Sequence, residues 1–309
     1  MTMHDTNNVD VQLINLYQKI LDNGVSSDDR TGEGTYSIWG HELRFDLSKG
    51  FPVASNKRVY YITAFKEMLW MLSGSDSLRP LLENNVHIWT EWPHKDYVKQ
   101  LPEGHPDKTI SLEAFEQRIL DDDKFAEQYG SLNRVYGKQW REWQGLNGEV
   151  IDQVSNVIRL IHDEPYSRRI IIEGWNCTDL EKMALPPCHK TYQFRVNQQT
   201  GALDSFLYQR SCDSFLGLAF FCDYEDAFLT TLIAHQTDRP VGEMVWYGTD
   251  VHIYKNHVEQ VKEMMSREVK AMPQLKIKRK ASSLFGYDIS DFELIGYEPH
   301  PAIEAPVAV

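Results

Sequence analysis

Apolar side chains recur along the chain with helical spacing in some segments and with strand spacing in others. They return every three or four positions in residues 11–21, 63–72 and 150–161, which predicts helices. Residues 36–45 and 244–254 alternate apolar and polar side chains, which predicts strands. The other predicted elements are a buried strand at residues 170–175, short exposed helices at residues 112–120 and 124–129, and helices at residues 223–235 and 256–269.

The centre of the chain has the pattern of a β-hairpin. Residues 189–196 alternate, a Gln-Thr-Gly turn follows at residues 199–201, and residues 203–207 continue as a second strand. This hairpin would bring Cys188 and Arg210 onto neighbouring strands. A guanidinium beside a thiol lowers the thiol pKa and can also hold an anionic substrate.

Cys188 also has an ordinary interpretation. A lone cysteine is usually a small buried apolar residue. Two prolines before it and His189 after it are unusual for a core strand, because proline removes a ladder hydrogen bond. These neighbours favour a catalytic thiol over a packing one, and both interpretations stay open.

Two further features lie in apolar surroundings. Glu67 falls inside the helix predicted at residues 63–72, where it either faces solvent beside Lys66 or points inward. An inward carboxyl would need partners and would be a candidate general acid–base. Trp89 and Trp92 stand three residues apart, a spacing more often found in cores than in ligand platforms.

Arginines and a strand end complete the candidate chemistry. Arg30 in a polar loop, and Arg168 and Arg169 before a predicted strand, are either solvated charges, the commoner case, or ligands of an anion. His252 and Tyr254 alternate on one strand and would share a face suited to gripping one hydroxyl.

Composition narrows the class of protein. The formal net charge of −13 over 309 residues argues against binding DNA or an anionic membrane non-specifically, although local arginines still permit a small phosphorylated substrate. The polar N-terminus is not a signal peptide, and no apolar run has membrane-spanning length. The four cysteines have no CxxC spacing and no zinc pattern is present, so we expect a cytoplasmic protein without a metal.

The chain resembles the thymidylate synthase family over nearly its whole length. Each matching segment is short, but their joint order is specific. The segment at residues 93–129 resembles the longer small domain of some bacterial members. The matching segments are Asp29-Arg30-Thr31-Gly32, Gly50-Phe51-Pro52, residues 66–70, Ile88-Trp89, residues 135–140, Ser167-Arg168-Arg169, Pro186-Pro187-Cys188-His189, residues 208–213, residues 250–254 and Pro306-Val307-Ala308-Val309.

This resemblance implies a fold, a co-substrate and a partner. The fold is α+β, a single catalytic domain over residues 1–309 with a surface insertion at about residues 93–129. Its large mixed sheet would be flanked by helices and packed against that of a dimer mate. The implied co-substrate is 5,10-methylenetetrahydrofolate, and the substrate is a pyrimidine 2′-deoxynucleoside monophosphate.

The resemblance also implies roles for individual residues. Cys188 would attack C6 of the base and so make C5 nucleophilic. Glu67 and Tyr136, with ordered water, would manage proton transfers, and Asp213 joins the catalytic group. The implied nucleotide ligands are Arg30, Arg168, Arg169, His189, Gln209, Arg210, Ser211, Asp223, His252 and Tyr254, with Arg168 and Arg169 coming from the partner subunit. The implied folate contacts are Lys57, Ile88, Trp89, Trp92, Asp213, Leu216 and Val309.

The chain departs from the family where the base is recognised. Ordinary thymidylate synthases continue Pro-Phe-Asn after Leu216-Gly217-Leu218, and the asparagine reads uracil. Here residues 219–226 run Ala-Phe-Phe-Cys-Asp-Tyr-Glu-Asp, without asparagine and with spacing that suggests one extra residue. Cytosine presents an amino donor that suits a carboxyl group, so Asp223 is the nearest candidate reader, and a helix N-cap is its bland interpretation. Smaller departures are Asn133-Arg134 for Gly-Pro, Glu173-Gly174 for Ser-Ala, and Tyr60 for a histidine.

These observations favour a folate-dependent C5 one-carbon transferase with altered base recognition. We lean towards dCMP as substrate, with a hydroxymethyl or a methyl product. The alternatives are an ordinary thymidylate synthase that converts dUMP to dTMP, a dUMP hydroxymethylase, and a non-catalytic homologue that binds nucleotide or RNA.

Overall fold

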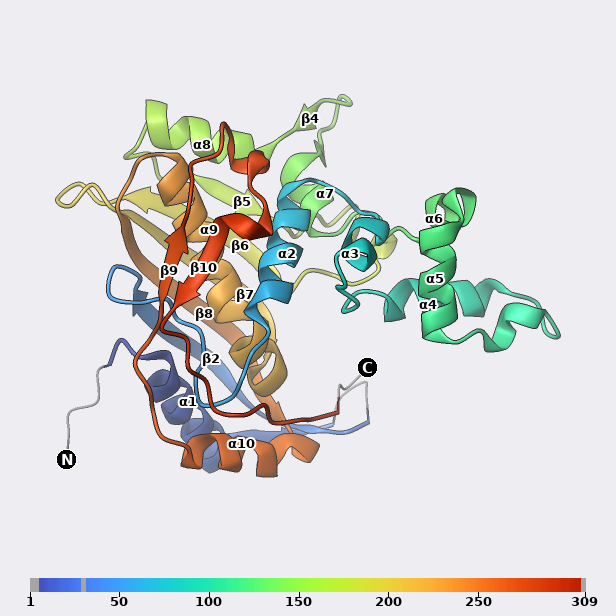
Figure 1. The fold of residues 1–309 in the computed structure, drawn as a ribbon, viewed down its shortest axis with the longest axis horizontal. Coiled ribbons are helices and arrows are strands. Elements are labelled where there is room, and N and C mark those ends of the chain that lie inside the picture. Colours follow the sequence, from blue (N-terminus) through green and yellow to red (C-terminus); the bar gives the residue numbers. More distant parts are fainter. Residues whose placement is uncertain (1–5, 29–31, 307–309) are drawn as a thin grey trace. The chain divides into compact units, whose positions relative to one another are not determined.

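The computed structural model describes residues 6–28 and 32–306, except for the side chains of residues 219–224 (Figure 1). The chain forms two compact units. Unit 1 comprises residues 1–65, 157–171 and 188–309, and unit 2 comprises residues 66–156 and 172–187. The insertion predicted at about residues 93–129 belongs to unit 2. No helix in the described ranges is long and apolar enough to cross a membrane.

Unit 1 is built on a mixed sheet. Strands β7 and β8 run parallel, whereas β7 pairs with β6, β8 with β2, and β2 with β1 in antiparallel fashion. The observed sheet and its helices confirm the predicted α+β class. In spatial order the six strands are β1 (Val25–Ser27), β2 (Thr35–Asp46), β8 (Val241–Tyr254), β7 (Leu203–Asp213), β6 (His189–Val196) and β5 (Ile171–Glu173).

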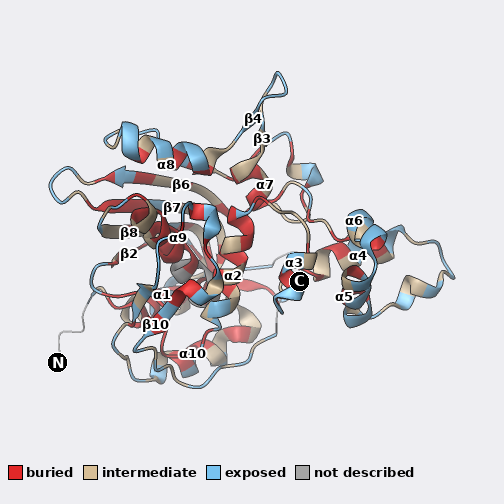
Figure 2. Cartoon of the chain, turned by 45° about the horizontal axis from the view of Figure 1, so that its top comes forward, coloured by how far each residue is buried: buried red, intermediate tan, exposed pale blue. Residues whose placement is uncertain are grey.

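Helices cover one face of this sheet. Helix α1 (Val9–Asn23) lies against β2 and β8, and α9 (Asp223–Gln236) lies against β7 and β8. The described part of α9 is almost entirely buried (Figure 2), because its apolar residues are not confined to one side. Phe228 of α9 stacks on Phe65 at 4.0 Å between ring centroids. The remaining elements of unit 1 are the π-helix η3 (Ser214–Cys222), η4 (Lys255–His257), α10 (Val258–Ser266), η5 (Leu284–Gly286), η6 (Ile289–Asp291), and the strand pair β9 (Gln274–Ile277) and β10 (Phe292–Ile295).

Unit 2 is mainly helical. The chain enters it within α2 (Tyr61–Leu72), leaves it within α8 (Gln153–Asp163) and returns to it at residues 172–187. Its aromatic side chains, among them Tyr97, Phe115 and Phe125, pack edge to face in the insertion. Its other elements are α3 (Arg79–Glu83), α4 (Glu91–Gln100), η1 (Pro106–Thr109), α5 (Leu112–Asp121), α6 (Asp123–Tyr129), α7 (Tyr136–Arg141), β3 (Trp143–Gln144), β4 (Val150–Ile151) and η2 (Leu180–Lys182).

Three element predictions need correction. The helix predicted from residue 150 begins at Gln153, because the β-branched pair Val150–Ile151 forms β4 against β3. The strand predicted at residues 170–175 spans three residues and is not fully buried, because β5 is an edge strand that exposes Ile171. The helices of the insertion are only partly exposed, since Phe115 and Phe125 anchor them in a core of their own.

Candidate functional site

The predicted hairpin brings Cys188 and Arg210 together. Cys188 immediately precedes β6, and its carbonyl oxygen accepts a hydrogen bond from the backbone N–H of Arg210 at 3.0 Å. The pairing register shifts between His189 and Thr191, which marks a β-bulge. Bulges re-aim side chains at the ends of strands. Cys188 is partly exposed, which a thiol that attacks a ligand requires.

His189 and Gln209 lie opposite each other on β6 and β7. His189 is buried, and burial lowers the pKa of its imidazole to about 4, so the ring is neutral at physiological pH. The side-chain oxygen of Gln209 accepts a hydrogen bond from Trp246 Nε1 at 2.7 Å, and its amide nitrogen donates to the carbonyl of Ser211 at 3.1 Å. The Gln209 side chain is therefore held in a defined orientation, opposite the residue that follows Cys188 in the chain.

Asp213 ends β7 and caps the π-helix η3. Its Oδ1 accepts hydrogen bonds from the N–H groups of Phe215 at 3.0 Å and Leu216 at 3.2 Å. The amine of Lys57 donates to the Phe215 carbonyl at 2.5 Å and lies 3.9 Å from the centre of its ring. Burial lowers the pKa of Lys57 to about 7, against the opposing effect of the Asp213 charge. Lys57 thus binds the backbone of the same turn that Asp213 caps.

The end of β8 carries the pair predicted to grip a hydroxyl. The rings of His252 and Tyr254 lie at 5.3 Å and nearly perpendicular, which confirms that they share one strand face. His252 Nδ1 lies 3.2 Å from Oδ1 of Asp250. Since β7 and β8 run in register, Asp213 lies opposite His252 and Ser211 lies opposite Asp250. The parallel pair thus brings together the predicted nucleotide ligands of two separate segments.

In unit 2, Glu67 points inward. Its carboxylate is buried and accepts a hydrogen bond of 2.6 Å from Trp89 Nε1, so the interpretation in which it faces solvent is wrong. Trp89 also contacts Tyr136, which begins α7, at 6.0 Å between ring centroids. Trp92 lies 5.4 Å from Trp89 and is partly exposed, as is Ile88. Trp89 therefore belongs to the core, as such pairs usually do, whereas the use of the partly exposed Trp92 as a ligand platform stays a prediction.

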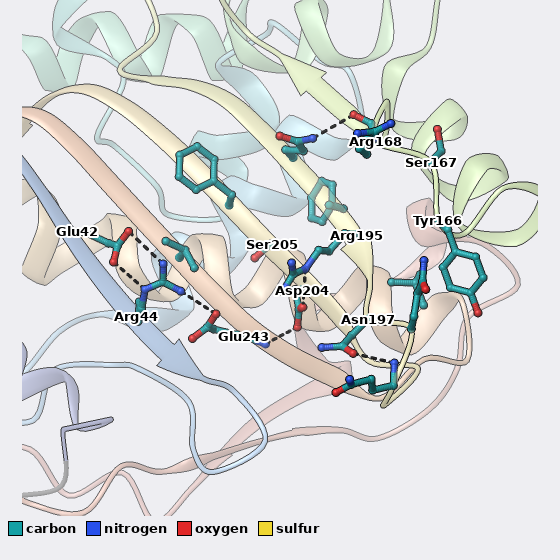
Figure 3. A pocket seen from close by; sticks show the side chains of 17 residues that line it. Glu42, Arg44, Tyr166, Ser167, Arg168, Arg195, Asn197, Asp204, Ser205 and Glu243 are labelled. Atoms are coloured by element: carbon teal, nitrogen blue, oxygen red, sulfur yellow. Dashed lines mark hydrogen bonds and ion pairs between the residues drawn. The ribbon is translucent and has the colours of Figure 1, made fainter.

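The open face of the unit 1 sheet is hollowed. A pocket of about 860 Å³ lies over β2, β8, β7 and β6 (Figure 3). Arg44 there pairs with Glu42 at 2.7 Å and with Glu243 at 3.0 Å. Arg168 lies at its rim, where its backbone carbonyl accepts a hydrogen bond from Gln193 at 3.1 Å. Arg168 and Arg169 are both exposed, so they remain available to an anion.

Three predicted site residues lie wholly or partly outside the described part of the chain. Arg30 and Val309 lie outside the described residues. Asp223 is the first residue of α9, and its side chain is not among the described ones. The preceding segment forms the π-helix η3, a form that accommodates an extra residue in a helix and often marks a functional site. That form agrees with the extra residue inferred from the sequence.

The structure accounts for two departures from the family pattern. Arg134 donates to Asp179 Oδ2 at 3.0 Å and to the Glu142 carbonyl at 2.8 Å, and so ties both ends of the α7 segment. Glu173 accepts a hydrogen bond from the Trp175 N–H at 2.9 Å, which fixes the turn after β5. Sequence reasoning missed Asp179, because no local pattern shows that an aspartate 45 residues away will pair with Arg134.

Comparisons with known proteins agree with these features. The family model described as thymidylate synthase matches residues 11–309. A thymidylate synthase of Rhizobium rhizogenes is 48% identical over 307 residues, covering 96% of this chain and 98% of the relative. Those of Zymomonas mobilis and Listeria innocua are 46% and 42% identical, each covering 96% of this chain and 99% of the relative.

Proposed function

The chain belongs to the thymidylate synthase family, a family of methylenetetrahydrofolate-dependent pyrimidine C5 methyltransferases, and we propose that it converts dUMP to dTMP. The observation that carries this proposal is the backbone hydrogen bond from Arg210 of β7 to Cys188, which immediately precedes the neighbouring strand β6. This pairing supports a nucleophilic thiol and an anion-binding arginine in one site. Relatives named thymidylate synthase that cover 96% of the chain favour uracil over cytosine as the base.

Cys188 is the proposed nucleophile. Its sulfur forms a bond to C6 of the pyrimidine, and the electron pair of the C5–C6 double bond moves to C5 and the C4 carbonyl. This makes C5 reactive in a ring that is otherwise inert. His189 is neutral, so the positive charge near the anionic substrate would come from Arg210. Elimination of the thiol at the end of the reaction restores the enzyme.

The folate supplies the one-carbon unit and the hydride that reduces it. Trp92, partly exposed against Trp89, presents the flat apolar surface that a pterin ring requires, so the residues fit this group. Ile88, Trp89, Leu216, Lys57 and Asp213 are the other proposed contacts in the described chain. Glu67 and Tyr136 would hold and move the proton that leaves C5, and the low exposure of Glu67 keeps bulk water away.

The nucleotide ligands are proposed by group. Arg210, Ser211 and Arg30 would bind the phosphate, because guanidinium forks suit a dianion. His252 and Tyr254 would hold the sugar hydroxyl, and Gln209, fixed by Trp246, would contact the nucleotide beside them.

We propose a homodimer through the open face of the unit 1 sheet. Phe206, Tyr247 and Trp39 are exposed there, and a monomer seldom leaves such a face open to water. Arg168 at the pocket rim, with Arg169, would then reach the phosphate of the partner's site. Replacing Phe206 by aspartate should give a monomer in analytical ultracentrifugation and abolish turnover. A dimer of unchanged affinity would contradict this assignment.

A second candidate is the transfer of a methyl or hydroxymethyl group to dCMP. The observation that favours it is residues 219–226, which contain no asparagine and place Asp223 at the start of α9. A carboxyl group pairs with the cytosine amino group as asparagine pairs with uracil.

The test is a mass spectrum of products from dUMP and dCMP, each incubated separately with 5,10-methylenetetrahydrofolate. We expect dTMP from dUMP. A modified dCMP would establish the second candidate, and its mass would separate methyl from hydroxymethyl. Release of tritium from C5-labelled nucleotide excludes a non-catalytic homologue that only binds nucleotide or RNA. Since the chain belongs to a family of nucleotide-biosynthesis enzymes, we propose that the reaction takes place in the cytoplasm.

A further inference from the structure

A buried hydrogen bond joins the strand of the nucleophile to α9. Tyr192 lies on β6, four residues after Cys188, and Asp226 lies in the first turn of α9. The tyrosine hydroxyl donates to Oδ1 of Asp226 at 2.5 Å. Both residues are only 1% exposed, so the bond lies in the core between the sheet and the helix.

This pair is a costly feature of the core. A buried carboxyl group needs hydrogen bonds, and Oδ2 of Asp226 has none among the described residues. Burial raises the pKa of Asp226 well above its ordinary value, and the bond from Tyr192 offsets only part of that effect. An apolar pair of similar volume would be cheaper here, so stability does not account for this one.

The pair fixes one end of the segment that departs from the family pattern. Asp213 holds the start of η3 through the N–H groups of Phe215 and Leu216. Asp226, bound to Tyr192, holds the turn that follows η3. Residues 214–225 thus lie between two carboxyl groups. Asp213 is the last residue of β7, and Asp226 is hydrogen-bonded to Tyr192 of β6.

A second contact keeps this turn of α9 in place. Thr230 Oγ1 lies 2.7 Å from Ser205 Oγ on β7 and 2.8 Å from the carbonyl oxygen of Asp226. Asp226 is therefore tied to β6 by its side chain and linked to β7 through Thr230. A shift of the helix start against Cys188 would have to break this network.

We propose that Tyr192 and Asp226 are positioning residues that set the place of residues 214–225 against the Cys188 strand, and so decide which pyrimidine base is accepted. This inference rests on the proposed function, since it concerns the base of the same nucleotide. Neither side chain needs to touch the substrate. Their effect is on the position of the residues that replace Pro-Phe-Asn.

The test compares variants at the two ends of α9. Y192F removes the hydroxyl, D226N keeps an acceptor for it, and Y192F/D226L removes both polar groups. Y287F is the matched control, because the Tyr287 hydroxyl lies 3.1 Å from Oε1 of Gln236, the last residue of α9. Each variant is assayed for kcat/KM with dUMP and dCMP, for its Kd for both nucleotides by calorimetry, and for Tm.

We expect the dUMP-to-dCMP ratio to change at least about fivefold in Y192F and in the double variant, as loss of one buried hydrogen bond can produce. D226N and Y287F should keep the wild-type ratio. A ratio that changes equally in Y192F and Y287F, or in neither, overturns the inference, whatever the loss in Tm. If the wild type converts neither nucleotide, the proposed function fails. The inference is then decided by the ratio of the Kd values for dUMP and dCMP, which should change at least about fivefold in Y192F and stay unchanged in D226N and Y287F. Absence of binding to both nucleotides overturns both proposals.

Discussion

The polar cluster at the ends of β7 and β8 and the Glu67 cluster of unit 2 are built in different ways. In the first, strand register sets the spacing: Asp213 lies opposite His252 because two backbones pair. In the second, one carboxylate is held by the indole of Trp89, and packing of Trp89 against Trp92 and Tyr136 fixes that indole. A site set by register can lose a side chain without moving its neighbours, whereas a site set by packing cannot.

The largest effect should follow from removing the nucleophile of the register-built site. C188S should lower kcat by at least about 1,000-fold, because nothing else in the cluster can form the bond to C6. Binding of dUMP, measured by calorimetry, should change little, since the strands stay paired. C177S is the matched control, because Cys177 is exposed and lies in unit 2, and it should keep wild-type turnover. Turnover of C188S near that of C177S would remove Cys188 from the mechanism.

The packing-built site should respond to changes at two positions. E67Q should lower kcat about 100-fold, because the amide cannot take up a proton. W89F leaves the carboxylate but removes its donor and part of the packing, so we expect a loss of roughly tenfold in kcat together with a lower Tm. Rates of tritium release from C5 measure both effects. Full activity of W89F would show that the Glu67 cluster, like the strand-built one, can lose a side chain without moving its neighbours.

Acid stability tests the network that supports α7. Burial would raise the pKa of Asp179, but hydrogen bonds from Gln139, Lys182 and Arg134 outweigh it and lower the pKa to about 2. The folded-state pKa lies below the unfolded value of 3.8, so the stabilisation is complete above about pH 4 and is lost as pH falls towards 2. D179N should lose about 2 kcal/mol at pH 7 and much less at pH 2.

Chemical denaturation of both proteins across this range measures the difference. K182A should lose less stability than D179N at pH 7, because the Lys182 side chain is 64% exposed and Gln139 and Arg134 still bind Asp179. An equal loss of stability in D179N at pH 7 and pH 2 would show that the Asp179 charge does not stabilise the fold.

The two clusters also differ in how far the sequence predicts them. Alternation predicted the hairpin of β6 and β7, and from it the nearness of Cys188 and Arg210, because a strand pair follows from local pattern. The direction of Glu67 stayed open, since a helix of apolar residues does not show which side is covered. The partners Trp89, Asp179 and Asp226 depend on contacts between distant segments, and no spacing encodes those. For the segment of the π-helix η3, the sequence predicted one extra residue but not the π-helical form.

The smallest effect should come from the support of His252 within the register-built site. Asp250 lies 3.2 Å from His252 Nδ1, and its side chain is 46% exposed, so water screens the interaction. D250N should raise KM for dUMP about threefold and leave kcat unchanged, because the amide oxygen still orients the ring. H252A, which removes the proposed sugar contact itself, should raise KM much further. Steady-state kinetics at saturating folate separate the two. A fall in kcat of D250N as large as that of E67Q would mean that the strand-built cluster is as tightly coupled as the packed one.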